Sequence, residues 1–219
     1  MLPEFGHYAL ILALCLAITQ VIFPLLGAAR GDTSYMQLAR YTTCGQFIFI
    51  SFSFFVLAYS FLSNDFSLAY VAENSNTHLP AIYRFCAMWG AHAGSLLLWV
   101  FILSIWMLAV SIFSRRLPLV MLSRVLAVLA LISIGFLLFL LTTSDPFIRL
   151  LPHFPNQGQS LNPILQDPGL VIHPPMLYMG YVGTTVAFAF AMAALLAGKL
   201  DVAWAKESLP WTIVAWCFL

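Results

Sequence analysis

The sequence predicts an all-α fold, a polytopic integral membrane helix bundle with about six transmembrane segments. Of the 219 residues, 62% are hydrophobic and only 8% are charged, and the mean hydropathy is +0.95. A soluble domain needs roughly 25% charged residues to cover its surface. We therefore expect most of the chain to lie in lipid.

Each predicted span is an apolar run close to the ~20 residues that cross a ~30 Å hydrocarbon core. Five runs meet that length, at residues 7–27, 42–63, 87–113, 118–142 and 175–197. A sixth run begins near Pro210 and is still apolar at Leu219. A helix that crosses only half of the membrane would leave backbone carbonyls unpaired in lipid. We therefore expect this sixth span to be truncated, and residues 1–219 to be the N-terminal transmembrane part of a longer protein.

The basic residues of the loops predict the orientation, because cytoplasmic loops carry an excess of Lys and Arg. Seven of them follow the first, third and fifth spans: Arg30, Arg40, Arg115, Arg116, Arg124, Lys199 and Lys206. The other two loops, about residues 64–85 and 144–172, contain only Arg84 and Arg149. The N-terminus and these two outward loops are expected to face away from the cytoplasm.

Several function classes have no visible residues. The net charge of +1 offers no basic field for nucleic acid, and the four cysteines form no CxxC spacing. None of the five full spans has Asp, Glu or Lys at its middle, where ion pumps usually place proton relays. No phosphate-binding loop, GxSxG or HExxH motif occurs. Nucleic-acid binding, ion pumping and hydrolysis are therefore disfavoured.

Histidine is the residue type to follow, since it can ligate iron or move protons near neutral pH. His173 stands in a His-Pro-Pro string where the second outward loop meets the fifth span. Proline is favoured at the first position of a helix. Pro174 and Pro175 are therefore expected to fix the start of the helix, and to aim the imidazole of His173 at the outer membrane–water interface.

Small and aromatic residues follow His173 along the fifth span. Tyr178 and Tyr181 come just below it, while Gly180 and Gly183 leave a groove that a flat ligand or another helix could enter. A planar, apolar, iron-bearing ligand would fit this arrangement. The alternative is that the tyrosines form an interfacial aromatic belt, the glycines pack helices and His173 caps the loop.

His92 is a secondary candidate, in the string WGAHAGS near the outer end of the third span. A histidine buried at that depth is a functional candidate, although a hydrogen bond between helices explains it equally well. His78 and His153 lie in the outward loops, where a solvated surface role is expected, and His7 is expected at the interface.

Three strings resemble one family. They are PLLGAARGD at residues 24–32, AYVAENSNTHLPAIYRFCAMWGAHAGSLLLW at 69–99 and LNPILQDPGLVIHPPMLYMGYVG at 161–183. They resemble the cytochrome c-type biogenesis protein CcmF family, which includes relatives in nitrite-reductase maturation. The likeness runs from the first span to the last residue.

The resemblance implies a membrane heme lyase, or holocytochrome c synthetase, in the bacterial inner membrane with its heme-handling loops on the periplasmic side. Such a protein receives heme b from the periplasmic heme chaperone CcmE. With a CcmH-type apocytochrome-binding subunit, it delivers the heme for thioether attachment to apocytochrome c. The resemblance also implies that His173 is an axial ligand to the heme in transit.

The sequence departs from the family pattern at two points. The tryptophan-rich WGxWWxWD motif is absent from residues 1–219, and it is expected downstream together with the site of a permanent b-type heme, so this portion alone is expected to be inactive. Ala93 stands where the family usually has an acid, which puts any acid-dependent role beside His92 in doubt. Two other functions stay open, a non-catalytic membrane scaffold subunit and a heme exporter.

Overall fold

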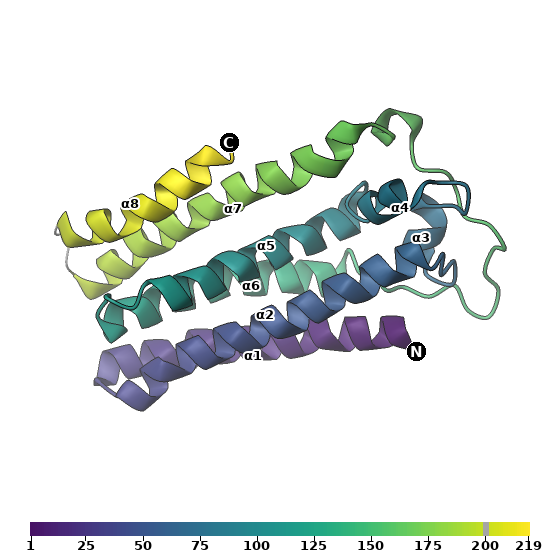
Figure 1. The fold of residues 1–219 in the computed structure, drawn as a ribbon. Helices are drawn as coiled ribbons and strands as arrows, with labels where there is room; N and C mark the ends of the chain where they lie inside the picture. The colour runs from purple at the N-terminus through teal and green to yellow at the C-terminus, as the bar shows by residue number, and fades with distance from the viewer. Residues whose placement is uncertain (199–201) are drawn as a thin grey trace.

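The computed structural model describes residues 1–198 and 202–219 and shows an all-α bundle (Figure 1). The helices that fall within these residues are α1 (Leu2–Arg30), α2 (Thr33–Leu62), α3 (Ala69–Asn74), α4 (Ala81–Ala87), α5 (His92–Phe113), α6 (Leu119–Thr142), α7 (Pro168–Ala197) and α8 (Val202–Cys217), with a 3-10 turn, η1 (Pro163–Leu165). Five of them, α1, α2, α5, α6 and α7, are long and apolar enough to cross a membrane. The prediction of an all-α membrane bundle is confirmed.

The long helices run side by side in three successive pairs, α1 with α2, α5 with α6, and α7 with α8 (Figure 1). Helix α1 packs against α2 and α6, and α7 packs against α8, α6 and α5, so α6 joins the first pair to the last. Helices α3 and α4, residues 143–167 and the N-terminus gather at one end of the bundle, which we call the loop end (Figure 1).

Local caps, more than hydropathy, set where the helices begin and end. Helix α1 runs to Arg30 and stops at Gly31, whose φ of 74° is left-handed, and Asp32 then caps α2 by accepting the N–H of Ser34 at 2.8 Å. Two predicted spans, 7–27 and 42–63, are therefore shorter than helices α1 and α2. A hydropathy window detects the apolar middle of a helix but not its polar caps.

The predicted third span, 87–113, is wrong at its start. Helix α4 ends at Ala87 and α5 begins at His92, and the link at residues 88–91 between them is not helical. The hydroxyl of Tyr70 donates to the carbonyls of Met88 and Ala91, at 2.9 and 3.0 Å, which holds the link in place. Helices α3 and α4 also give the first outward loop regular structure that its Asn and Pro content did not suggest.

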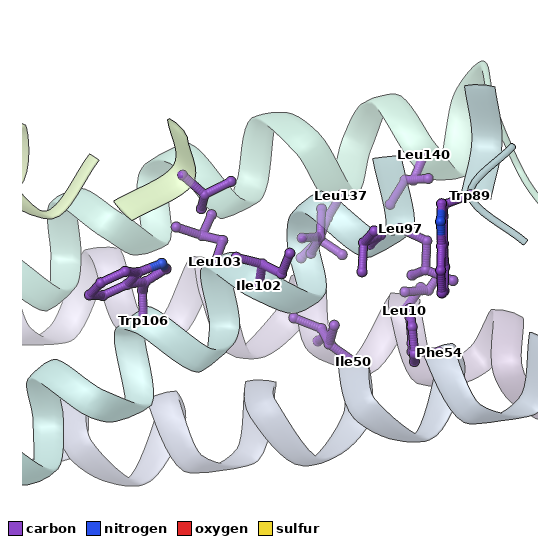
Figure 2. Close-up of a cluster of buried hydrophobic side chains, with 14 of the residues drawn as sticks. Leu10, Ile50, Phe54, Trp89, Leu97, Ile102, Leu103, Trp106, Leu137 and Leu140 are labelled. Carbon is purple, nitrogen blue, oxygen red and sulfur yellow. The ribbon is translucent and has the colours of Figure 1, made fainter. Parts of the chain in front are cut away.

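The core runs the length of the bundle. Figure 2 shows Trp89 and Trp106 at opposite ends of one stretch of it, with buried leucine and isoleucine side chains between them. A polar chain lies inside the first half of the bundle. Gln46 donates to Gln20 at 2.7 Å, and Gln20 donates to the carbonyl of Leu126 on α6 at 2.9 Å. Both amides are fully buried, so each needs these partners.

The two outward loops are bonded to each other at the loop end. The backbone N–H of Ala69 donates to Ile148 at 2.9 Å, and that of Leu150 donates to Ser67 at 2.8 Å. Further along, the N–H of Gln159 donates to Ala72 at 2.7 Å. The paired loops form one platform over the helix ends.

Arg149 joins this platform to the first helix. Its side chain is 22% exposed and contacts Glu4 of α1 at 3.0 Å and Asp65 at 3.3 Å. Ser67 hydrogen-bonds both the guanidinium of Arg149 and the carboxylate of Asp65. The guanidinium thus forms ion pairs with two carboxylates from different segments.

Gly94 provides the first test of this fold. A Cβ at this position would lie 1.7 Å from the carbonyl oxygen of Met88, so Gly94→Ala is expected to lower the stability of the protein in detergent by about 3 kcal/mol. Gly135→Ala is the matched control, since nothing lies within 4 Å of its Cβ, and it is expected to stabilise helix α6 by about 0.5–1 kcal/mol. Thermal unfolding followed by circular dichroism measures both. Similar melting temperatures for the two variants would contradict the packing at residues 88–94.

Arg149 provides the second test. Arg149→Ala removes the cation that Glu4 and Asp65 share, and we expect a loss of about 1 kcal/mol in the local stability of the paired loops. Limited proteolysis within residues 150–160 is then expected to be about five-fold faster. Arg116→Ala is the control, because Arg116 is exposed and makes no ion pair with the described residues. Equal cleavage of both variants would show that Arg149 does not hold the platform.

Candidate functional site

Helix α7 begins before the His-Pro-Pro string. Asp167 caps it by accepting the N–H of Gly169 at 2.7 Å, and Pro168 occupies the first helical position. His173 is the sixth residue of this helix, and Pro174 and Pro175 lie inside it. The expectation that these two prolines start the helix is therefore wrong. The upstream pair, Asp167 and Pro168, provides both a side-chain cap and a proline. The His-Pro-Pro string has prolines but no such cap.

Prolines inside the helix leave backbone carbonyls without their usual donors. Pro174 has no N–H for the carbonyl of Leu170, and Pro175 has none for that of Val171. The indole N–H of Trp89, from the link before α5, donates to the carbonyl of Leu170 at 2.9 Å. The start of α7 is thereby bonded to the start of α5.

The imidazole of His173 lies on the exposed side of α7. Among the described residues, no hydrogen bond or ion pair engages its ring. Met176 and Tyr181, three and eight residues further along the helix, are 43% and 53% exposed. Residues at these spacings share one face of a helix. We call His173, Met176 and Tyr181 the His173 ledge, an unbonded imidazole above an apolar surface.

Tyr178, Gly180 and Gly183 do not lie on the His173 ledge but face other helices of the bundle. The ring of Tyr178 lies 5.1 Å from that of Trp99 on α5, inside the bundle. A Cβ on Gly180 would lie 2.6 Å from the side chain of Leu219, and one on Gly183 would lie 2.7 Å from Trp106. The groove at the glycines is therefore filled by α8 and α5. The sequence left open whether a flat ligand or another helix enters this groove. In the structure, helices enter it.

His92 is placed differently from the expectation. It is the first residue of α5 and is exposed, so the expected burial is wrong. Its Nδ1 lies 3.0 Å from the hydroxyl of Ser144, and its ring packs edge-on against Phe139 of α6. The alternative of a hydrogen bond between helix ends matches this geometry. The non-helical link moves His92 to the helix terminus, which a continuous apolar run had concealed.

His7 forms a pair that sequence reasoning missed. Its Nδ1 lies 2.9 Å from Oδ2 of Asp145, and both residues line a pocket of about 230 Å³ with Glu4, Tyr8 and Phe147. The two residues are far apart in the chain, so no local spacing could have indicated the pair. His78 and His153, by contrast, are exposed in the outward loops, as expected.

Cys86 offers little reactivity. It is a free thiol, and burial raises its pKa to about 11. A thiol with that pKa is neutral near pH 7 and a weak nucleophile. The other three free cysteines, Cys15, Cys44 and Cys217, are exposed.

The His173 ledge fits an iron porphyrin better than a free metal ion. The described residues contain no group of three His, Cys, Asp or Glu side chains that could hold a metal ion. A porphyrin brings four nitrogen ligands of its own, so a single imidazole from the protein is enough to bind its iron. The apolar side chains beside His173 suit the flat face of such a ligand.

Comparison with known proteins identifies the relatives of this chain. A family model described as cytochrome C assembly protein matches residues 89–219. The cytochrome c-type biogenesis protein CcmF of Pseudomonas aeruginosa is 65% identical over 219 residues, covering 100% of this chain and 33% of the relative. CcmF of Escherichia coli is 54% identical, and NrfE of Haemophilus influenzae is 39% identical, each covering 100% of this chain and 34% of the relative.

The fold has a relative among solved structures. A structure named cytochrome c heme lyase CcmF superposes with a TM-score of 0.85 at 30% identity, covering 100% of this chain and 34% of that one. The chain thus spans about a third of the length of the curated relatives that it matches. The resemblance found in the three sequence strings is confirmed, and the chain belongs to the cytochrome c assembly protein family.

Proposed function

We propose that this chain is part of a membrane heme lyase, a holocytochrome c synthetase of cytochrome c maturation, and that it presents heme through His173. The observation that carries the proposal is the His173 ledge, where an imidazole without a hydrogen-bond partner among the described residues stands above exposed apolar side chains. Heme iron takes an imidazole as an axial ligand. The names of the relatives, CcmF and cytochrome c heme lyase, support the same function.

In this proposal, His173 is the axial ligand that holds the iron and fixes the tilt of the porphyrin. Met176 and Tyr181, the exposed apolar side chains of the ledge, would help to hold the porphyrin beside His173. Heme b supplies two vinyl groups, the carbons that receive the cysteine sulfurs of apocytochrome c in thioether attachment. The proposal assigns a permanent b-type heme to a part of the protein outside residues 1–219.

The orientation follows from charge and architecture together. The start of α7, the two outward loops and the N-terminus lie at the loop end (Figure 1), while most Lys and Arg residues follow the opposite ends of the spans. We therefore place the loop end on the periplasmic side of the bacterial inner membrane. Heme from CcmE and apocytochrome c with a CcmH-type subunit would reach the ledge from that side.

The test compares His173→Ala with His153→Ala in the full-length protein, purified with its partners. Loss of the axial imidazole is expected to lower the heme captured by about ten-fold, equivalent to about 1.4 kcal/mol of binding. It is also expected to remove the absorption bands that depend on an imidazole ligand. His153 is an exposed loop histidine, so His153→Ala is expected to keep the wild-type spectrum.

Unchanged heme content in His173→Ala would remove His173 from heme binding. That outcome would favour a non-catalytic scaffold. If heme also crossed the bilayer of liposomes that contain the protein, an exporter would replace the lyase.

A further inference from the structure

The first turns of α7 depend on a hydrogen bond from outside the helix. Pro174 removes the backbone N–H that would normally bond the carbonyl of Leu170. Leu170 is buried, and the indole N–H of Trp89 supplies the missing donor at 2.9 Å. A buried carbonyl without a donor is costly. The bond from Trp89 therefore offsets a loss that the His-Pro-Pro string creates.

Trp89 is itself held from several sides. Its side chain is 6% exposed, and its ring packs edge-on against Phe85 of α4 at 5.2 Å. The carbonyl of Trp89 accepts the hydroxyl of Ser95 at 2.8 Å. The carbonyls of Met88 and Ala91, on either side of Trp89 in the link, accept the hydroxyl of Tyr70. The indole is thus a fixed donor.

Tyr70 keeps its proton in this arrangement. Burial is the main reason that the pKa of the Tyr70 hydroxyl is raised above its usual value, so the group stays a neutral donor to the two carbonyls. Hydrogen bonds thus join α3 to the 88–91 link, and that link to the first turn of α7. His173 lies three residues beyond Leu170.

We infer that Trp89 is a positioning residue for His173, which sets the direction of the imidazole by holding the carbonyl of Leu170 one turn before it. The inference rests on the proposed role of His173 as an axial ligand of heme. Trp89 itself lies in the core and does not contact the ligand. Its indole N–H fixes the tilt of the turn that carries His173, and hence the angle at which the imidazole meets the iron.

The inference has a chemical signature. The orientation of an axial imidazole affects the electronic state and reduction potential of heme iron. Removing the indole donor is expected to shift the ligand-sensitive absorption bands and to increase the heme dissociation constant about ten-fold. It is also expected to speed hydrogen exchange of a peptide covering residues 168–179 about ten-fold, even without heme.

Four variants of the full-length protein test it. Trp89→Phe removes the indole N–H but keeps an aromatic ring in the core. Trp89→Phe with Pro174→Ala returns a backbone N–H to the carbonyl of Leu170, so we expect it to restore exchange and heme binding to near wild-type values. Trp106→Phe is the matched control, because Trp106 also donates to a carbonyl of α7, that of Met179 at 3.2 Å.

The carbonyl of Met179 does not depend on the indole of Trp106. Gly183, four residues further along the helix, has a backbone N–H that can bond it. Trp106→Phe is therefore expected to leave the heme bands unchanged. His173→Ala is the fourth variant, measured in the same series. A shift in Trp89→Phe that the added Pro174→Ala reverses would support the inference, since lost ring packing would not be repaired by a backbone donor.

Two results would overturn it. A wild-type spectrum, heme affinity and exchange rate in Trp89→Phe would show that the indole donor does not position His173. Equal defects in Trp89→Phe and in the double variant would show that the indole acts through packing alone. If His173→Ala itself kept wild-type heme, the proposed function would fail, whereas a heme defect in His173→Ala beside a normal Trp89→Phe would reject only the positioning role.

Discussion

A backbone carbonyl away from water must have a donor, and at Leu170 that donor comes from outside the helix, from the link before α5. Two consecutive prolines in α7 remove two backbone N–H groups where this helix leaves the platform. The indole of Trp89 replaces one of them, which joins the start of α5 to the start of α7. Further along α7, before its middle, Trp106 donates to the carbonyl of Met179. The two tryptophans therefore hold α7 along the α5 side of the bundle.

The first half of the bundle is held by a different kind of contact. Gln20 and Gln46 join α1, α2 and α6 through amide hydrogen bonds in a fully buried interior. Such bonds favour one register between helices, because any other register would leave an amide unpaired in an apolar medium. At the loop end, Arg149 and the pair of His7 with Asp145 join α1 to the residues that follow α2 and α6. Helix α6 takes part in both halves, so the platform and the ledge share one rigid support.

The sequence was informative where a feature depended on composition or on one segment. Hydropathy predicted five spans, because burial in lipid needs continuous apolar runs and little else. It misplaced the boundary of α5 because residues 88–91 are as apolar as a helix and are held open by Tyr70, a residue from another segment. The start of α7 was likewise misplaced, at Pro174 and Pro175 of the His-Pro-Pro string, although the cap at Asp167 was readable from the string QDPGL.

The candidate site divides in the same way. His173 could be found from its neighbours in the sequence, and its exposure agrees with a ligand role. Tyr178 and Gly180 were assigned to that site because they follow it closely, but the rotation of the helix turns Tyr178 toward Trp99 and α8 covers Gly180. The donor from Trp89 could not be predicted, since it joins residues that only the packing of α5 against α7 brings together.

The five histidines show what distinguishes a candidate ligand from the rest. An imidazole that is to bind iron needs a free ring nitrogen and a backbone that fixes the direction of the ring. His7 and His92 are aimed, but each is engaged by a hydrogen bond, to Asp145 and Ser144 respectively. His78 and His153 are exposed on the outward loops, where no helix fixes their direction. His173 is exposed and lies on a helix whose first turn accepts a hydrogen bond from Trp89. The proline pair that removes hydrogen bonds within α7 also leaves the carbonyl of Leu170 free to accept this bond.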